Sequence, residues 1–253
     1  MGPNVGVDWG STGWICAVLD DEGRWDARLH PSFASVWHNH CDADSMLVDI
    51  PIGLTEEGLR ECDRAAADVL ADRQGSVFYT PPRPVLGARS YPEAKAEYED
   101  RTGRGMTTQA WSIMPRIREL DEFLAQHPSA HATNREAGGL RESHPEVCFR
   151  RLAAGDVSHS KLEGDGEAER LAILEHHHPG TRAAFRRLES ELIDRFAPHE
   201  RRFSTDHRDD VVDAMDVSAA VTVETDLPLR TGFGLSGGMA LGTALAANHV
   251  FGL

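Results

Sequence analysis

The sequence contains almost no lysine. Of its 253 residues 26 are basic, and Lys95 and Lys161 are the only lysines among them. Asp and Glu together number 41, which gives a formal net charge of −15. An acidic, lysine-poor composition is typical of proteins that work in molar salt, where the Debye length is about 3 Å and repulsion between exposed carboxylates is screened. We therefore interpret the chain as halophilic; an ordinary acidic protein from a GC-rich genome is the alternative.

Long hydrophobic runs and a secretory signal are also missing. No stretch approaches the roughly 20 apolar residues of a transmembrane helix. The first ten residues include Asp8 and no basic residue, unlike a signal peptide. The four cysteines form no CxxC pair and show no ligand spacing, which argues against a conventional zinc site, and they are too few for a disulfide framework. These absences predict a cytoplasmic protein with reduced thiols and no membrane partner.

The negative charge bears on nucleic acid as a partner. Phosphate binding depends on Lys and Arg and weakens with salt, so a charge of −15 normally argues against it. In molar salt this argument loses force, because the electrostatic contribution is small for every protein. Residues 182–208 carry seven arginines and five acids. This stretch is either a helix with a solvated face or a rim that faces phosphate.

The pattern of apolar residues predicts alternating strands and helices. Three strands joined by tight turns are expected at 5–10, 14–20 and 24–30. A helix over 33–40 and an apolar strand within 45–54 follow them. Apolar spacing near 3.6 residues predicts further helices, and Pro145 is expected to end a strand that begins near 138. The further helices lie within 55–127 and at 166–177, 182–197 and 207–225.

This order of elements predicts an α/β fold of the RNase H-like type. Such a fold has a mixed sheet flanked by helices, in which a three-strand meander precedes parallel strands. The length allows one sizeable core. We expect a single domain over residues 1–253, with a helical insertion at about 55–127.

Acidic residues interrupt the apolar elements at several points. Asp8 lies within the first strand, Asp49 ends the fourth and Glu142 lies in the next. Asp210 and Asp213 lie on one face of the last helix. Burying an ionised carboxylate costs several kcal/mol unless it is compensated, so acids gathered from separate elements indicate a bound cation. Mg²⁺ or Mn²⁺ suits oxygen ligands, and two such ions about 3.5–4 Å apart activate water and stabilise the leaving oxygen of a phosphodiester.

Each acid also has a simpler interpretation. Asp8 could cap the turn at 11–13, and Asp49 could bond to the backbone after its strand. Glu142 could pair at the surface with Arg141, Arg150 or Arg151. Asp210 and Asp213 could belong to a solvated helix face. The acids taken together favour a metal site more than any one of them does.

Four motifs in order connect the chain with a known family. They are GVDWGSTGW, VDIPIGL, ESHPEVCFRRL and DDVVDA. With RECDRAA, SVFYTPPR and QAWSIMPRIRELD between them, the chain resembles the domain-of-unknown-function family numbered 429 (DUF429) over about residues 5–235. That family is generally regarded as a group of predicted RNase H-like nucleases.

The resemblance implies a metal-dependent nuclease that hydrolyses nucleic acid with Mg²⁺ or Mn²⁺. The implied acidic centre comprises Asp8, Asp49, Glu142 and the pair Asp210 and Asp213. Asp8 would bridge the metals, and Asp49, Glu142 and Asp210 or Asp213 would complete their ligands.

The same resemblance implies residues around this centre. His144 and Glu146 would flank it, and His144 would orient a water or protonate a leaving group, unless it only caps the turn before Pro145. The basic positions implied to meet phosphate are Arg60, Arg83 and Lys161.

Two other functions fit parts of the sequence. DWGST at 8–12 resembles the first phosphate loop of the actin and sugar-kinase fold, and GLSGG at 234–238 resembles its glycine pair. That fold usually needs two domains, which 253 residues hardly hold, and a second Asp-x-Gly loop is missing. A non-enzymatic scaffold with surface carboxylates is the other alternative. The choice between DNA and RNA and the oligomeric state stay open.

Overall fold

The computed structural model describes residues 2–10, 13–130, 139–159 and 164–196. The helix expected at 207–225 lies outside these residues. The strands are β1 (Asn4–Gly10), β2 (Gly13–Leu19), β3 (Trp25–His30), β4 (Ser45–Val48) and β5 (Leu140–Glu142). The α-helices are α1 (Phe33–His40), α2 (Glu61–Leu70), α3 (Tyr91–Thr102), α4 (Thr108–Gln126), α5 (Pro145–Leu152), α6 (Gly164–His177) and α7 (Thr181–Phe196). The short 3₁₀ helices are η1 (Ala71–Ser76), η2 (Arg83–Gly87) and η3 (Pro128–Ala130).

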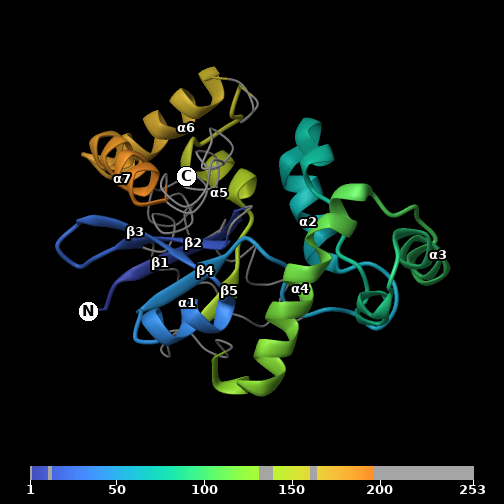
Figure 1. Ribbon diagram of the computed structural model, residues 1–253. Helices are drawn as coiled ribbons and strands as arrows, with labels where there is room; N and C mark the ends of the chain where they lie inside the picture. Colours follow the sequence, from blue (N-terminus) through green and yellow to red (C-terminus); the bar gives the residue numbers. More distant parts are fainter. Residues whose placement is uncertain (1, 11–12, 131–138, 160–163, 197–253) are drawn as a thin grey trace.

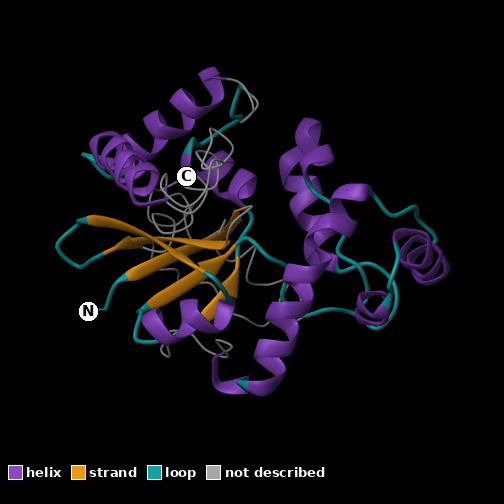
Figure 2. Cartoon of the chain, in the orientation of Figure 1, coloured by secondary structure: helices purple, strands orange, loops and turns teal. Residues whose placement is uncertain are grey.

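The strands form one mixed sheet in the order β3-β2-β1-β4-β5, with helices on both faces (Figures 1 and 2). β1, β2 and β3 are antiparallel neighbours, whereas β1 and β4, and β4 and β5, are parallel. This is the RNase H-like topology that the order of elements predicts, so the fold class is confirmed. α5 was not foreseen as a helix; it begins at Pro145, because proline suits the first turn of a helix as well as the end of a strand.

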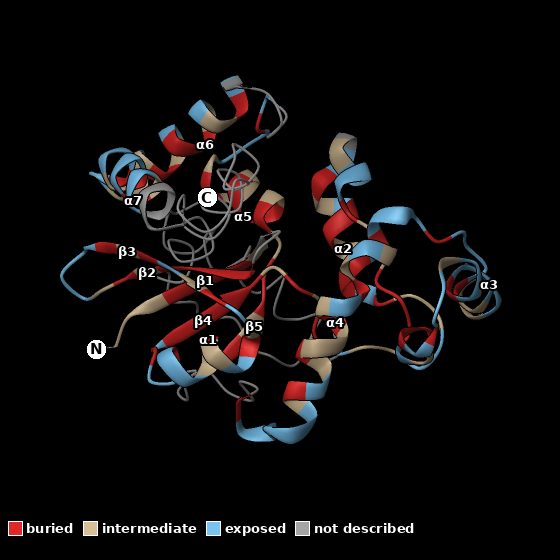
Figure 3. Ribbon diagram, viewed as in Figure 1, coloured by how far each residue is buried: buried red, intermediate tan, exposed pale blue. Residues whose placement is uncertain are grey.

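Successive side chains of a strand point to opposite faces of the sheet, and this divides the core into two layers. On β2, Trp14 and Cys16 belong to the layer that also contains residues of α1 and α4. Ile15 and Ala17 point to the opposite layer, which contains residues of α5, α6 and α7. Both faces of β2 are therefore buried, as Figure 3 shows for the central strands.

The segment between β4 and β5 contains α2, α3 and α4 and lies beyond one end of the sheet in Figure 1. It is largely helical, as the apolar spacing predicts. Several of its apolar residues, among them Tyr98 and Ile117, belong to the same core layer as Val7 and Val48 of the sheet. Among the residues that the structure describes, no helix is both long and apolar enough to cross a membrane.

Gly13 begins β2 where the backbone of β3 approaches closely. A Cβ atom at this position would lie 2.5 Å from the carbonyl oxygen of His30. We expect Gly13→Ala to lower the free energy of unfolding by about 1–3 kcal/mol, because one of the two backbones must shift. Urea unfolding measures this. Gly87→Ala is the control, because no heavy atom lies within 4 Å of its added Cβ; an equal loss in both variants would contradict the close approach.

Candidate functional site

Three of the predicted acidic residues lie at one edge of the sheet. β1, β4 and β5 run parallel, so their carboxyl ends point to the same edge. Val7 pairs with Val48, and Val48 pairs with Glu142. Asp8 and Asp49 follow Val7 and Val48 directly. The topology thus brings together three acids that are far apart in the sequence.

These acids line one cavity of about 620 Å³, together with His144. Asp8 is only 8% exposed, and Asp49 is half-buried. The remaining lining includes the aromatic side chains of Trp9 and Phe78. A volume of this size is typical of pockets that hold a small molecule or a nucleotide.

Asp8 is held by its local backbone. Its Oδ1 accepts a hydrogen bond from the backbone N–H of Trp9 at 2.7 Å. Asp8 pairs with Ile15 across the β1–β2 ladder and so lies on the sheet face towards α5. The guanidinium of Arg116 stacks on the Trp9 ring, 3.8 Å from its centroid. The alternative that Asp8 caps the turn at 11–13 falls on residues 11 and 12, which lie outside the described part of the chain.

Glu142 binds a buried arginine from α2's amino-terminal end. Arg60 donates from Nη1 to Oε2 and from Nη2 to Oε1, each at 2.7 Å. The backbone N–H of Ile52 also donates to Oε2 at 2.8 Å. The alternative that Glu142 pairs with a surface arginine nearby in sequence is therefore wrong. Burial raises the pKa of Glu142, and the positive charge of Arg60 opposes that shift.

Arg60 uses all five of its N–H donors within the protein. Besides Glu142, it donates from Nη1 to the carbonyl oxygen of Ile52 at 2.8 Å. It also donates to Oδ1 of Asp63, from Nε at 3.1 Å and from Nη2 at 2.5 Å. Burial alone would lower the pKa of Arg60, but the carboxylates of Glu142 and Asp63 outweigh burial and raise it. The expectation that Arg60 meets phosphate is wrong, because no donor remains for a ligand.

Within the described part of the chain, buried side chains in two places could hold a metal ion. One group comprises Cys62, Asp63 and Glu142, whose ligand atoms lie within 4.8 Å of one another. Arg60 already binds both of these carboxylates and supplies a positive charge at this point. A second cation would have to displace it, so this group is a poor metal site. The other group, Cys16 with two histidines, lies at the core layer that contains residues of α1.

The SHPE stretch turns from β5 into α5 beside the cavity. His144 is the N-cap residue of α5 and lines the cavity. Glu146, in the first turn of α5, also lines it. Its carboxylate accepts hydrogen bonds from the fully buried Arg170 of α6 at 2.5 Å and from Arg73 of η1 at 3.3 Å. Glu146 therefore connects three helical segments around the cavity.

The structure does not bring every predicted residue to this place. Arg83 is absent from the lining of the cavity; its 43% exposed side chain pairs with Asp121 and Glu56 on the side of α4. Lys161, Asp210 and Asp213 lie outside the described residues.

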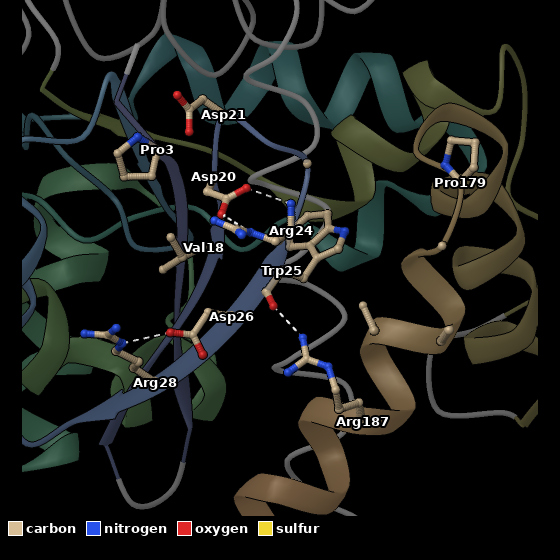
Figure 4. A pocket seen from close by; sticks show the side chains of 14 residues that line it. Pro3, Val18, Asp20, Asp21, Arg24, Trp25, Asp26, Arg28, Pro179 and Arg187 are labelled. Atoms are coloured by element: carbon tan, nitrogen blue, oxygen red, sulfur yellow. Dashed lines mark hydrogen bonds and ion pairs between the residues drawn. The ribbon is translucent and has the colours of Figure 1, made fainter.

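A second cavity, of about 850 Å³, lies beside the β2–β3 turn and the turn before α7 (Figure 4). Its charged side chains are largely paired: Asp20 with Arg24, and Asp26 with Arg28. β2 ends here at Leu19, opposite Asn4. This cavity is therefore at the other end of the strands from Asp8, and the smaller cavity with the acids is the better candidate site.

Sequence reasoning missed the partners that hold the acids in place. Arg60 and Asp63 were visible as an i, i+3 pair at the start of a helix, but nothing in their spacing indicates Glu142, 82 residues away. Trp9 and Phe78 were visible only as aromatic residues in motifs. Their place in the cavity depends on how the segment between β4 and β5 folds back to the sheet.

The fold and the acids at the carboxyl edge of parallel strands define an RNase H-like protein. The chain belongs to DUF429, the family described as "Protein of unknown function", whose model matches residues 6–224. Neither the search of curated proteins nor that of solved structures gives a match.

Proposed function

We propose that this protein is a metal-dependent nuclease that hydrolyses phosphodiester bonds of nucleic acid in the cavity of about 620 Å³. The observation that carries the proposal is the placement of Asp8 and Asp49 at the ends of neighbouring parallel strands, on the wall of one cavity. Two carboxylates at a partly dehydrated site repel each other unless a cation lies between them. Their hard oxygen atoms suit Mg²⁺ or Mn²⁺.

Asp8 and Asp49 would hold the metal, and Asp210 or Asp213 would complete the ligands. When bound, the metal supplies an activated water and stabilises the leaving oxygen. Glu142 acts in this proposal as a positioning residue. Both of its oxygens accept hydrogen bonds from Arg60, and Oε2 also fixes the backbone of Ile52, three residues after Asp49. His144 lines the same cavity and would orient a water or protonate the leaving oxygen.

Aromatic side chains in the cavity support nucleic acid as the substrate class. Trp9 and Phe78 line the cavity, and bases stack on aromatic rings with little dependence on sequence. Arg116 stacks on Trp9 and pairs with Glu119 at 2.5 Å. Stacking matters here because a protein of charge −15 gains little from long-range attraction to phosphate.

The proposal is tested by cleavage of a substrate panel in molar KCl with Mn²⁺. The panel contains single strands, duplexes, an RNA–DNA hybrid and a four-way junction. We expect the parent protein to cut at least one substrate and chelation of the metal to abolish cleavage. Asp49→Asn should lower the cleavage rate by more than about 10-fold. Removing a residue that only supports a metal ligand already costs at least this much, and Asp49 would bind the metal itself.

Asp100→Asn is the matched control, because Asp100 is an exposed acid of α3. Its rate should equal that of the parent. Should the folded parent protein cut nothing, the nuclease proposal fails and the scaffold function takes its place. Binding of ATP by such an inactive protein would instead favour the actin and sugar-kinase alternative.

A further inference from the structure

A cluster of three potential metal ligands lies away from the acidic cavity. Cys16 comes from β2, His30 ends β3 and His40 ends α1. The Sγ atom and one ring nitrogen of each histidine all lie within 4.8 Å of one another. All three side chains are buried, with 0% of Cys16 and 5% of each histidine exposed. Their sequence spacing matches no short metal-binding motif.

We propose that Cys16, His30 and His40 form a binding site for a zinc ion. One thiolate and two imidazoles are ligands typical of zinc, whereas Mg²⁺ and Ca²⁺ prefer oxygen ligands. The ion would join side chains from two strands and a helix. This site is independent of the proposed nuclease activity.

The two imidazoles already have the geometry of ligands on a common ion. Their Nε2 atoms lie 3.3 Å apart. Two nitrogens at 2.0–2.1 Å from a tetrahedral zinc ion lie about 3.3–3.4 Å apart. The ring centroids are 5.2 Å apart. If the two rings pointed straight at each other with their Nε2 atoms at this distance, the ring centroids would lie about 5.6 Å apart. If both rings pointed at one tetrahedral zinc ion, the centroids would lie about 5.2 Å apart.

A neighbouring hydroxyl group holds His30 in the orientation that a ligand needs. Nδ1 of His30 lies 3.1 Å from Oγ of Ser35, in the first turn of α1. A proton on Nδ1 donated to that hydroxyl leaves the lone pair on Nε2, the atom that lies 3.3 Å from Nε2 of His40. Such a hydrogen bond from the second ring nitrogen accompanies most metal-binding histidines.

The surroundings can accommodate the charge of the ion. The positive charge of Arg28 acts on all three side chains, but the half-exposed Arg28 pairs with Asp26 at 3.0 Å. Cys16 would lose its thiol proton to solvent when zinc binds, so thiolate and ion partly neutralise each other. The site is also separate from the acidic cavity. Cys16 pairs with Val7 and lies on the α1 face of the sheet, whereas the next residue of β1, Asp8, points to the other face.

Co²⁺ titration of tag-free protein tests this site, with Co²⁺ serving as a spectroscopic substitute for zinc. We expect one Co²⁺ per chain to give tetrahedral visible bands and a thiolate-to-cobalt charge-transfer band in the near ultraviolet. Cys16→Ser should lose the charge-transfer band. Cys62→Ser, which removes the buried thiol of the other candidate group, should keep it. Zinc at about a hundredfold above its Kd should raise the Tm of the parent by about 5 °C, and that of Cys16→Ser by much less.

X-ray absorption on the zinc-loaded parent protein makes the test independent of any variant's folding. The expected first shell contains one sulfur and two imidazole nitrogens. A first shell without sulfur, failure to bind Co²⁺ or zinc, or a charge-transfer band that survives Cys16→Ser would each overturn the proposal. In those cases the two histidines form only a buried hydrogen bond.

Discussion

Asp8→Asn is expected to abolish Mn²⁺-dependent cleavage while leaving the protein folded. Asp8 lies at the centre of the proposed metal site, so the loss in kcat/KM should exceed the roughly 100-fold that follows from removing an outer-shell partner. The amide oxygen of Asn can still accept the hydrogen bond that Oδ1 of Asp8 receives from the Trp9 N–H. The variant also loses a negative charge beside Asp49. Without metal, its free energy of unfolding should therefore equal or exceed that of the parent.

Two measurements on the same samples separate a metal ligand from a structural residue. Urea unfolding without metal gives the stability, and titration with Mn²⁺ followed by electron paramagnetic resonance gives the metal affinity. A ligand role requires weaker Mn²⁺ binding at unchanged or higher stability. If Asp8→Asn instead unfolds, Asp8 is structural and its assignment to the metal centre fails. Asp100→Asn again serves as the control, with activity, affinity and stability all unchanged.

Arg60→Met is expected to destabilise the protein by about 3–5 kcal/mol, the loss typical of a buried ion pair from which one partner is removed. Arg60 is 4% exposed, and its guanidinium binds Glu142 and Asp63. Methionine fills a similar volume but leaves both carboxylates without their cation. Urea unfolding at constant KCl measures the loss. Adding Glu142→Gln to Arg60→Met should restore part of the stability, because it removes one of the two uncompensated charges.

Arg83→Met is the matched control for Arg60→Met. Arg83 also binds two carboxylates, those of Asp121 and Glu56, but its side chain is 43% exposed. Water and salt screen such pairs, so we expect a change of less than about 1 kcal/mol. An equal loss of stability in the two variants would show that burying the ion pairs of Arg60 with Glu142 and Asp63 has no energetic consequence. The positioning role given to Glu142 would then lose its physical basis.

Much of the fold could be predicted from local pattern. The strands at 5–10, 14–20 and 24–30 were recognisable because side chains of a strand alternate between two faces and tight turns carry characteristic residues. Both signals lie within a few neighbouring positions. α5 was missed because a strand of only three residues is followed closely by a helix of only eight, and that helix begins with a proline. Such short elements carry too few periods to be distinguished.

The sequence by itself determined which acids would interrupt buried strands, and this was enough to place Asp8, Asp49 and Glu142 at one edge once the strand order was known. Only the tertiary structure decided their partners. Glu142 has four arginines within nine residues along the chain but binds Arg60, 82 residues away. Cys16, His30 and His40 likewise meet only because α1 packs on the sheet. A side chain's own burial follows from local periodicity, whereas the group opposite it is set by contacts between elements distant in sequence, which no local pattern encodes.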